Sequence, residues 1–460
     1  MQNLTGATAL LWIALHGAPD WAEVTGPPEG TWPEEQAAVV WRDDLNKALA
    51  EARREDRPLF VTARCLPCKQ CSEFDRDVLE GGPELDPLLS RFVTVRLTDA
   101  AQLDLRLFDL ERFQDLDLSW WGWFLSPEGA TYGVFGGRDG VSDTTRISVP
   151  ALAATLARVL DHHADPRRKS WNIDGPVPDL SEPQRGPRDL PGYRSWRTKL
   201  PENEASSCLH CHQVADILRQ PAIDAGRYDK GRNLNVWPLP ENVGLTLDRD
   251  DGLCVTDVAP DSPAARAGLR KGDVLVAADG RRVFSQTDVR AALHRAADPS
   301  GKLELVARRP RGEDHLGFLV QTRFELTPGW RATDLAWRMS ASQGNVGAAP
   351  GFGWPHAGPR NAALTPGGMS IRPWFGPRAA QSVAWQAGLR PSHTIVAVRR
   401  AGESSREQEA TPEASPDLSA RAFLVWFRQR FDPGDRVALT VREGSELRTI
   451  EYTLPESRPE

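Results

Sequence analysis

Long hydrophobic runs are missing from this chain of 460 residues, and hydrophobic residues make up only 40% of it. A helix that spans a bilayer needs about 20 predominantly apolar residues, and no stretch of the sequence approaches that length. A polytopic membrane protein is therefore excluded. The chain also lacks an excess of basic charge, because 56 basic residues stand against 63 acidic ones and no basic block or stripe is present. The net charge of −7 argues against a nucleic-acid partner.

Cysteine is scarce as well, with six residues in 460, which excludes a small disulfide-knotted fold. Five of the six lie in two tight clusters, Cys65, Cys68 and Cys71 in the first and Cys208 and Cys211 in the second. Clusters as tight as these indicate redox or metal chemistry rather than a scattered structural framework. A chain of this length is expected to form about three domains.

Residues 1–37 are a candidate signal peptide or N-terminal extension. The nine residues from Ala7 to Leu15 form an apolar run of the length typical of the central part of a secretion signal, and they are too few to cross a bilayer. No Lys or Arg precedes the run as it would in an ordinary signal, so a disordered start is the alternative.

Residues 38–165 alternate between helical and strand patterns, which predicts an α/β domain around a central sheet. The expected helices are Trp41–Arg54, Cys68–Leu79, Leu103–Phe113 and Val149–His162, and the expected strands are Pro58–Ala63, Phe92–Leu97, Trp121–Leu125 and Thr131–Phe135. The last two strands flank a Ser-Pro-Glu-Gly turn signal and should form a hairpin.

The first cysteine cluster follows an expected strand and opens the next helix. At such a junction the free N–H groups and the positive end of the helix dipole stabilise a thiolate at Cys65. Cys68, three residues on, can then resolve a mixed disulfide. Together with Pro67 and Lys69, these thiols form a Cys-x-Pro-Cys-Lys motif that resembles the thioredoxin superfamily, over about residues 41–163. The resemblance implies a thiol–disulfide centre in which Cys65 and Cys68 are the catalytic residues.

Two features depart from that family. Its members carry a proline just before the hairpin strand, whereas the segment Leu118–Trp123 contains none, so the resemblance is weaker for substrate docking. Cys71 adds a third thiol on the same helical face as Cys68. Three thiolates at Cys65, Cys68 and Cys71 could ligate copper(I) or zinc(II). A metal site and a plain structural disulfide are therefore alternatives to the redox pair.

Residues 166–203 are interrupted by prolines and charges, which predicts an extended linker without a core. The segment 204–240 contains Cys208-Leu-His-Cys211-His212, the Cys-x-x-Cys-His pattern of c-type haem attachment. Cys208 and Cys211 would add to the haem vinyl groups as thioethers, and His212 would ligate the iron. The segment is too short to enclose a haem by itself, so neighbouring domains would have to cover it.

Two alternatives stay open for this second cluster. Cys208 and Cys211 could form a redox pair, or His210 and His212 could join them in a zinc knuckle. The distal haem ligand is not determined by the sequence. The candidates are Met339, Met369, His294, His315, His356 and His393.

Residues 241–325 have the pattern of a compact β-rich module. The stretch Leu253–Leu275, with Gly268 and Gly272 at tight turns, resembles PDZ domains, particularly those of bacterial envelope proteases. The resemblance implies a loop that captures the C-terminal carboxylate of a peptide, and a groove beside Thr287–Ala296 that accepts the peptide as an added strand. The loop residues are Asn242, Val243, Gly244 and Leu245.

An intramolecular packing module is the alternative to a peptide-binding one. Cys254 alternates inward on an expected strand and should be an inert part of the core. No Gly-x-Ser-x-Gly signature occurs in the chain, so no motif indicates a serine protease.

The C-terminal part repeats the β-rich module in a degenerate form. The same four residues, Ala-Gly-Leu-Arg, end an expected helix at 267–270 and again at 387–390. We therefore expect a second, degenerate PDZ-like domain at 367–456, joined to the first by a connection rich in glycine and proline at 326–366.

The order of a thioredoxin-like domain, a Cys-x-x-Cys-His segment and PDZ modules is similar to a bacterial family of thioredoxin/PDZ fusion proteins, some of which carry selenocysteine in the redox motif. The expected fold is multidomain, an α/β domain followed by β-rich domains. The resemblance implies a periplasmic redox protein in which the thiols and a covalent haem c transfer electrons and the PDZ domains recruit a protein partner. The alternative is a non-enzymatic scaffold that binds peptide, or copper or zinc at Cys65, Cys68 and Cys71.

Overall fold

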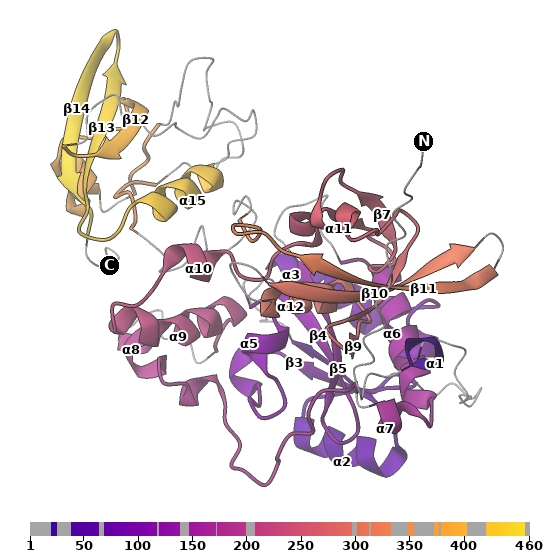
Figure 1. Cartoon of the computed structure of the whole chain (residues 1–460). Coiled ribbons are helices and arrows are strands. Elements are labelled where there is room, and N and C mark those ends of the chain that lie inside the picture. Colours follow the sequence, from indigo (N-terminus) through magenta and orange to yellow (C-terminus); the bar gives the residue numbers. More distant parts are fainter. Residues whose placement is uncertain are drawn as a thin grey trace, which may run out of the picture.

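Figure 1 shows the protein as a computed structural model. The residues that it describes are 20–24, 38–63, 69–116, 119–138, 147–171, 173–198, 208–296, 301–311, 314–332, 348–353, 372–376, 379–402 and 420–455. The first α/β domain and the following β-rich module pack against each other, while the C-terminal unit lies to one side of them (Figure 1).

A five-stranded sheet in the order β1-β3-β2-β4-β5 forms the first domain. Its strands are β1 (Trp41–Arg42), β2 (Leu59–Ala63), β3 (Val93–Leu97), β4 (Ser119–Leu125) and β5 (Thr131–Arg138). The first three run parallel, and the expected hairpin β4–β5 adds two antiparallel strands. Its helices are α2 (Leu45–Glu55), α3 (Lys69–Glu80), α4 (Asp86–Leu89), η1 (Ala100–Gln102), α5 (Leu110–Phe113) and α6 (Val149–Ala164). The prediction of an α/β domain is confirmed.

One expected helix is wrong for most of its length. In the segment Leu103–Phe113 only the last turn, α5, is α-helical. Asp104 accepts a hydrogen bond from the backbone N–H of Arg106, and Asp109 accepts one from the backbone N–H of Arg112. Carboxylates that bind nearby backbone N–H groups favour turns and caps over a helix interior, so the chain turns at Asp104 and begins its helix only after Asp109.

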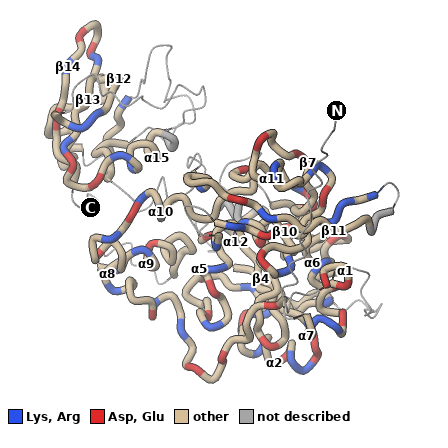
Figure 2. Tube along the Cα trace, viewed as in Figure 1, with Lys and Arg blue, Asp and Glu red and all other residues tan. Residues whose placement is uncertain are grey.

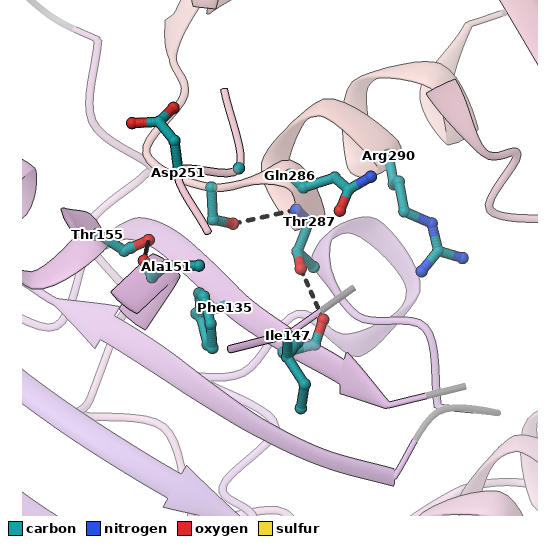
Figure 3. A pocket seen from close by; sticks show the side chains of 11 residues that line it. Phe135, Ile147, Ala151, Thr155, Asp251, Gln286, Thr287 and Arg290 are labelled. Carbon is teal, nitrogen blue, oxygen red and sulfur yellow. Dashed lines mark hydrogen bonds between the residues drawn. The ribbon is translucent and has the colours of Figure 1, made fainter. Parts of the chain in front are cut away.

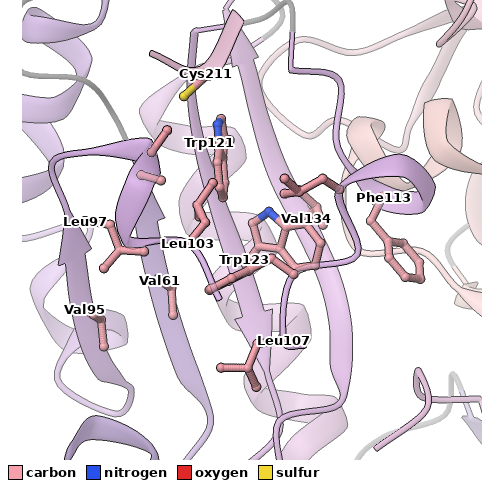
Figure 4. Close-up of a cluster of buried hydrophobic side chains, with 14 of the residues drawn as sticks. Val61, Val95, Leu97, Leu103, Leu107, Phe113, Trp121, Trp123, Val134 and Cys211 are labelled. Carbon is pink, nitrogen blue, oxygen red and sulfur yellow. The ribbon is translucent and has the colours of Figure 1, made fainter. Parts of the chain in front are cut away.

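Strand β4 alternates its large side chains between the two faces of the sheet. Trp121 and Trp123 belong to the core on one face, and Trp120 and Phe124 belong to the core on the other. All four side chains are fully buried. The period-two alternation of a strand therefore puts aromatic rings at the centre of both layers, and Figure 4 shows the face that contains Trp121 and Trp123.

Helix α6 ends in a buried histidine that is held in its neutral form. Tyr132 OH lies 2.9 Å from Nδ1 of His163, and Nε2 of His163 lies 3.0 Å from the carbonyl oxygen of Asp56. Because Arg168 donates to Tyr132 OH at 2.9 Å, the tyrosine hydroxyl can give its own proton to Nδ1, which leaves Nε2–H to bind the carbonyl. Burial lowers the pKa of His163 from 6.5 to about 4.

This histidine should make the first domain sensitive to acid. Between pH 6.5 and 4 the unfolded chain takes up a proton at His163 while the folded chain does not, so stability falls as the pH falls, by about 3 kcal/mol for this group. We expect the His163→Gln variant to lose correspondingly less stability than the wild type over this window in urea unfolding. The exposed His212→Gln should follow the wild type. Parallel pH profiles for wild type and His163→Gln would contradict the prediction.

The proline-rich segment that follows is packed against the first domain at Trp196 and against the β-rich module at Trp171. It contains α7 (Arg168–Trp171), η3 (Pro187–Asp189) and α8 (Tyr193–Thr198), and it continues into α9 (Cys211–Asp224) and α10 (Lys230–Leu234). Trp171 and Trp196 are buried, and Trp196 joins the core that contains Trp121 and Trp123. An extended linker without a core was expected here, but the two tryptophans bury too much apolar surface for the segment to stay detached.

Two small sheets form the β-rich module. It contains η5 (Pro240–Val243), β6 (Leu245–Leu247), β7 (Val255–Val258), α11 (Pro263–Arg266), β8 (Val274–Ala278), β9 (Arg281–Arg282), α12 (Gln286–Arg295), β10 (Lys302–Arg311) and β11 (Asp314–Glu325). The sheet orders are β11-β10-β8-β9 and β6-β7. Both enclose one apolar core. Gly268 and Gly272, at φ of 82° and 88°, occupy the tight turns expected of them.

The C-terminal unit repeats part of this topology. Its elements are η6 (Ala379–Gln381), α14 (Val383–Gln386), β12 (Thr394–Arg400), α15 (Ala420–Arg430), β13 (Arg436–Glu443) and β14 (Glu446–Thr453). The sheet order β12-β13-β14 matches β8-β10-β11 of the first module, with a short helix before the first strand and a longer helix before the second. Lys230 of α10 pairs with Asp432 at 2.6 Å and thereby contacts this unit.

Charges of both signs are interspersed along the described chain (Figure 2). In the described ranges, no helix has the length and apolar character needed to cross a membrane.

Candidate functional site

The first cysteine cluster connects β2 to α3. Cys65 and Cys68 lie outside the described residues, which stop at Ala63 and resume at Lys69. Cys71 lies in the first turn of α3. The backbone on either side of the cluster is the expected one, because a buried parallel strand leads into a helix of 12 residues.

Three strands meet where β2 ends. Ala63, the last residue of β2, is in register with Leu97 on β3 and with Trp121 on β4. Parallel strands end at the same edge of a sheet, so the chain leaves toward Cys65 beside the end of β3. We refer to this place, defined by Ala63, Leu97 and Trp121, as the thiol edge of the sheet.

Helix α3 is held at the sheet by a buried polar contact that the sequence pattern did not reveal. Asp75 accepts a hydrogen bond from Nε1 of Trp120 at 3.3 Å and pairs with Arg96 at 2.7 Å. Phe74 packs edge-on against the Trp120 ring, with centroids 4.6 Å apart. Trp120 has a φ of 54°, which is strained for a bulky residue. A buried tryptophan therefore occupies the segment Leu118–Trp123, in which the proline typical of thioredoxins is missing.

The second cysteine cluster lies at the N-terminus of α9. Cys211, the first residue of the helix, is buried with 7% of its surface exposed. Cys208 and His210 are half-buried, whereas His212 is exposed. The rings of His210 and His212 stack with centroids 5.4 Å apart. Cys211 and His212 are neighbours in the chain, yet they face different surroundings.

The backbone between the two thiols docks at the end of β3. The N–H of Ala100 donates to the carbonyl of Leu209 at 3.1 Å, and the N–H of Leu209 donates to Asp99 Oδ1 at 2.9 Å. Leu209 is buried, and Val214 and Ile217 of α9 enter the core of the first domain with it. The second cluster is therefore packed as part of the first domain, two or three residues beyond the thiol edge on β3.

Cys211 lies against Trp121 in this core (Figure 4). The indole Nε1 of Trp121 is buried and has no acceptor among the described residues. Figure 4 shows the nitrogen end of the ring directed toward Cys211. An indole N–H is a donor only. The Cys211 sulfur, as packed, is outside hydrogen-bond geometry, so a sulfur anion there would satisfy the donor only by coming closer to it. Sequence reasoning missed Trp121 because a tryptophan on a buried strand normally indicates packing.

As they are packed, the residues of the second cluster do not fit a haem. A thioether at Cys211 would bring the porphyrin edge to the place that the Trp121 indole occupies. The iron ligand would be His212, which is exposed rather than turned toward that core. The covalent haem expected at Cys208, Cys211 and His212 therefore stays a prediction of the sequence.

Metal binding by the first cysteine cluster also stays a prediction of the sequence. Within the described ranges, no three His, Cys, Asp or Glu side chains gather as they would around a metal ion. The thiols of Cys65, Cys68 and Cys71 are not among the described side chains. Cys254 is a half-buried free thiol whose pKa is raised by burial, as befits an unreactive position.

The four residues expected to capture a peptide carboxylate form the turn from η5 into β6. Val243 and Leu245 are buried, and Asn242 donates from Nδ2 to the carbonyl of Trp330 at 3.0 Å. Gly244 has a φ of 84°, and a Cβ there would come within 2.1 Å of a neighbouring side chain. Among the described strands β6 pairs with β7 alone, so its other edge is open to an added strand.

Helix α12, which the PDZ resemblance places beside a peptide groove, is buried from Gln286 to Leu293 and is clamped onto the first domain by its N-terminal turn. Asp288 accepts hydrogen bonds from the N–H groups of Val134 on β5 at 2.8 Å, Phe284 at 2.9 Å and Ser285 at 3.1 Å. Ser285 donates in turn to the carbonyl of Val134. Burial raises the pKa of Asp288 to about 6 even though three N–H groups favour its charged form. We call these contacts the clamp.

A second contact, between Arg290 and Asp115, lies one turn along α12. Nη2 of Arg290 is 2.8 Å from Asp115 of the first domain and 2.9 Å from the carbonyl of Trp237. Both charged side chains are buried. Figure 3 shows the cavity beside α12, where Thr287 donates to the carbonyl of Gly136 at 2.7 Å. The cavity measures about 10 Å³, so it holds at most one water molecule.

Comparison with known proteins identifies two domains in the chain. Residues 40–114 match a family described as thioredoxin-like, and residues 254–309 match the PDZ domain family. The chain is also 34% identical to the serine protease HTRA1 of Xenopus laevis over 71 residues, which is 15% of each chain. It is 42% identical to the magnetosome formation protease MamE of Magnetospirillum gryphiswaldense over 67 residues, 14% of this chain and 8% of the relative.

These comparisons confirm a thioredoxin-like domain and a PDZ domain in one chain. The chain spans 15% or less of the length of the two proteases, so the similarity concerns a module rather than the whole protein. Neither matched region reaches Cys208 to His212 or the C-terminal unit.

Proposed function

We propose that the protein is a thiol–disulfide exchange protein in which a PDZ domain, fixed to the thioredoxin-like domain, recruits the protein partner. The observation that carries this proposal is the Cys-x-Pro-Cys-Lys motif at the β2–α3 junction of a domain that matches the thioredoxin-like family. A strand that ends at a helix N-terminus supports a low thiol pKa in the residues between them.

The reaction is an ordinary thiol–disulfide exchange. The Cys65 thiolate attacks one sulfur of a partner disulfide, and the other partner sulfur leaves as a thiolate that takes up a proton. The Cys68 thiolate then attacks Cys65, releases the second partner thiol and closes a Cys65–Cys68 disulfide. Two electrons and two protons pass to the partner, and the reverse sequence would oxidise it.

The first test measures disulfide reduction in insulin with dithiothreitol as the electron source. We expect the wild type to accelerate the reaction and Cys65→Ser to reduce the rate to the uncatalysed background, because the variant lacks the thiolate that attacks the partner disulfide. Cys254→Ser is the matched control and should keep full activity, since this thiol lies on the PDZ domain and has a raised pKa. Equal rates for wild type and Cys65→Ser would refute the assignment. Stoichiometric copper or zinc that is lost in Cys71→Ser would favour a metal-binding scaffold instead.

The PDZ domain supplies a place for the C-terminus of a partner. The turn at 242–245 and the open edge of β6 support the binding of a free carboxylate followed by an added strand. The C-terminal unit, with its matching strand order, is proposed to be a second, degenerate PDZ-like domain. We place the protein outside the cytoplasm, in the bacterial envelope, on the basis of the apolar run at residues 7–15.

A further inference from the structure

Cys208 and Cys211 have the arrangement of a dithiol. They are separated by two residues at the start of α9, a helix of 14 residues, with the first thiol half-buried and the second buried. The N–H groups of a helix N-terminus stabilise a thiolate there. Leu209, between them, is anchored to residues 99 and 100 by two hydrogen bonds of 2.9 and 3.1 Å. The spacing and the anchoring hold both sulfurs at one place on the first domain.

Trp121 provides a second and independent feature at this place. Its Nε1–H is fully buried, has no acceptor among the described residues and is directed toward Cys211. A buried donor without an acceptor is destabilising, because it has given up its hydrogen bond to water. A hydrogen bond to a charged acceptor would remove that destabilisation and would favour the thiolate over the thiol. A thiolate of Cys211 that came within reach of this donor would accept its hydrogen bond, and Trp121 would then be a positioning residue for the charged sulfur.

The pair is bound near the edge of the sheet from which the chain continues toward Cys65. Trp121 is in register with Ala63, the residue at which β2 ends and after which the chain runs to Cys65. Leu209 is bound to the residues that follow β3, the strand paired with β2 on its other side. The second cysteine pair is therefore bound beside the thiol edge of the sheet. The first cysteine cluster follows Ala63, a residue of that edge, in the sequence.

From these observations we infer that Cys208 and Cys211 form a second thiol–disulfide centre, which exchanges electrons with the thioredoxin-like thiols. The Cys208 thiolate attacks Cys65 of a Cys65–Cys68 disulfide, and Cys68 leaves as a thiolate and is protonated. The Cys211 thiolate then attacks Cys208, forms the Cys208–Cys211 disulfide and releases Cys65. The first pair gains two electrons and two protons, the second pair loses them, and an external dithiol reduces the second pair again. The exchange rests on the proposed function, but the existence of the second centre does not.

The first experiment tests the second centre alone. A variant with Cys65, Cys68 and Cys71 all replaced by serine is equilibrated in dithiothreitol buffers of increasing potential, alkylated and analysed by mass spectrometry. We expect Cys208 and Cys211 to lose their thiols together at a single potential. Thiols that stay reduced throughout would overturn the inference. So would a pyridine haemochrome spectrum showing covalent haem on the wild-type protein produced with the cytochrome c maturation machinery.

The second experiment tests Trp121 with a substitution that keeps an aromatic ring. In the same triple-serine background, Trp121→Phe removes only the N–H donor, so the pH profile for iodoacetamide alkylation of Cys211 should move to higher pH. The rate at pH 7 should fall about three- to tenfold. Trp123→Phe is the matched control, a buried indole on the same face of β4, and should leave the profile unchanged. Equal shifts in both variants would overturn the role of Trp121.

The third experiment tests the exchange. The Cys68→Ser/Cys211→Ser variant lacks both resolving thiols, so a mixed disulfide between Cys65 and Cys208 should accumulate after mild oxidation and appear as one cross-linked peptide. Cys254→Ser in the same background should give the same yield. If the triple-serine variant of the first experiment forms the Cys208–Cys211 disulfide, absence of this cross-linked peptide in the Cys68→Ser/Cys211→Ser variant would overturn the exchange. Failure of the insulin assay with a positive first experiment would count against the proposed function alone.

Discussion

Replacing Arg290 with methionine is expected to destabilise the protein by about 3 to 5 kcal/mol. The substitution leaves the Asp115 carboxylate buried without its guanidinium, whose Nη2 lies 2.8 Å from it. It also removes the hydrogen bond to the carbonyl of Trp237. Guanidinium chloride unfolding, followed by tryptophan fluorescence, measures the loss. We expect the PDZ domain to separate from the thioredoxin-like domain at lower denaturant concentration than in the wild type.

Two control variants test whether the burial of the Arg290–Asp115 ion pair, rather than the loss of any ion pair, accounts for the loss of stability. Arg323→Met breaks an ion pair with Glu304 whose side chains are 54% and 36% exposed, and it should cost less than about 1 kcal/mol. The double variant Asp115→Leu/Arg290→Met removes both buried charges and should recover most of the loss, because neither charge is left uncompensated. Equal costs for Arg290→Met and Arg323→Met would mean that burial does not govern this contact.

Replacing Asp288 with alanine is expected to cost about 3 to 6 kcal/mol. Three buried N–H groups, those of Val134, Phe284 and Ser285, lose their acceptor together, and each costs about 1–3 kcal/mol when it is left unsatisfied. Burial raises the pKa of Asp288 to about 6, so the charged carboxylate is itself destabilising above pH 6. Its removal therefore offsets part of the cost of the three unsatisfied N–H groups, and the lower half of the range applies at neutral pH. Urea unfolding at pH 7 gives the free energy.

Limited proteolysis adds a readout that is specific to the clamp. Loss of the clamp should expose the chain around 284–288 to cleavage before the cores of the two domains unfold. Asp257→Ala is the matched control, an exposed carboxylate on the same PDZ domain, and should change neither stability nor cleavage. A protected 284–288 segment in Asp288→Ala would show that the clamp is not what joins the domains.

The clamp has a consequence for the proposed function. Helix α12 would flank the groove proposed for a partner C-terminus, and its first turn is bound to β5 of the thioredoxin-like domain. A partner held in that groove would therefore approach the thioredoxin-like domain from one fixed direction. Fixing the direction lowers the entropic cost of bringing a partner disulfide to the attacking thiol.

The sequence by itself determined the two domains and the position of the first cysteine cluster. A buried strand running into a helix, a hairpin around a Ser-Pro-Glu-Gly turn and glycines at positive φ are local features, and local features can be read from neighbouring residues. The error at Leu103–Phe113 has a local cause as well, because Asp104 and Asp109 compete for backbone N–H groups, and helical periodicity does not register this competition.

The tertiary structure decided what surrounds the second cysteine cluster. Cys-x-x-Cys-His is the same local signal whether the thiols carry a haem or form a dithiol, and the two cases differ only in what packs against them. The burial of Cys211 beside Trp121 and the anchoring of Leu209 at residues 99 and 100 join positions about ninety or more residues apart. Contacts over such separations arise only when the apolar faces of the sheet and of α9 bury each other, and no pattern of neighbouring residues encodes them.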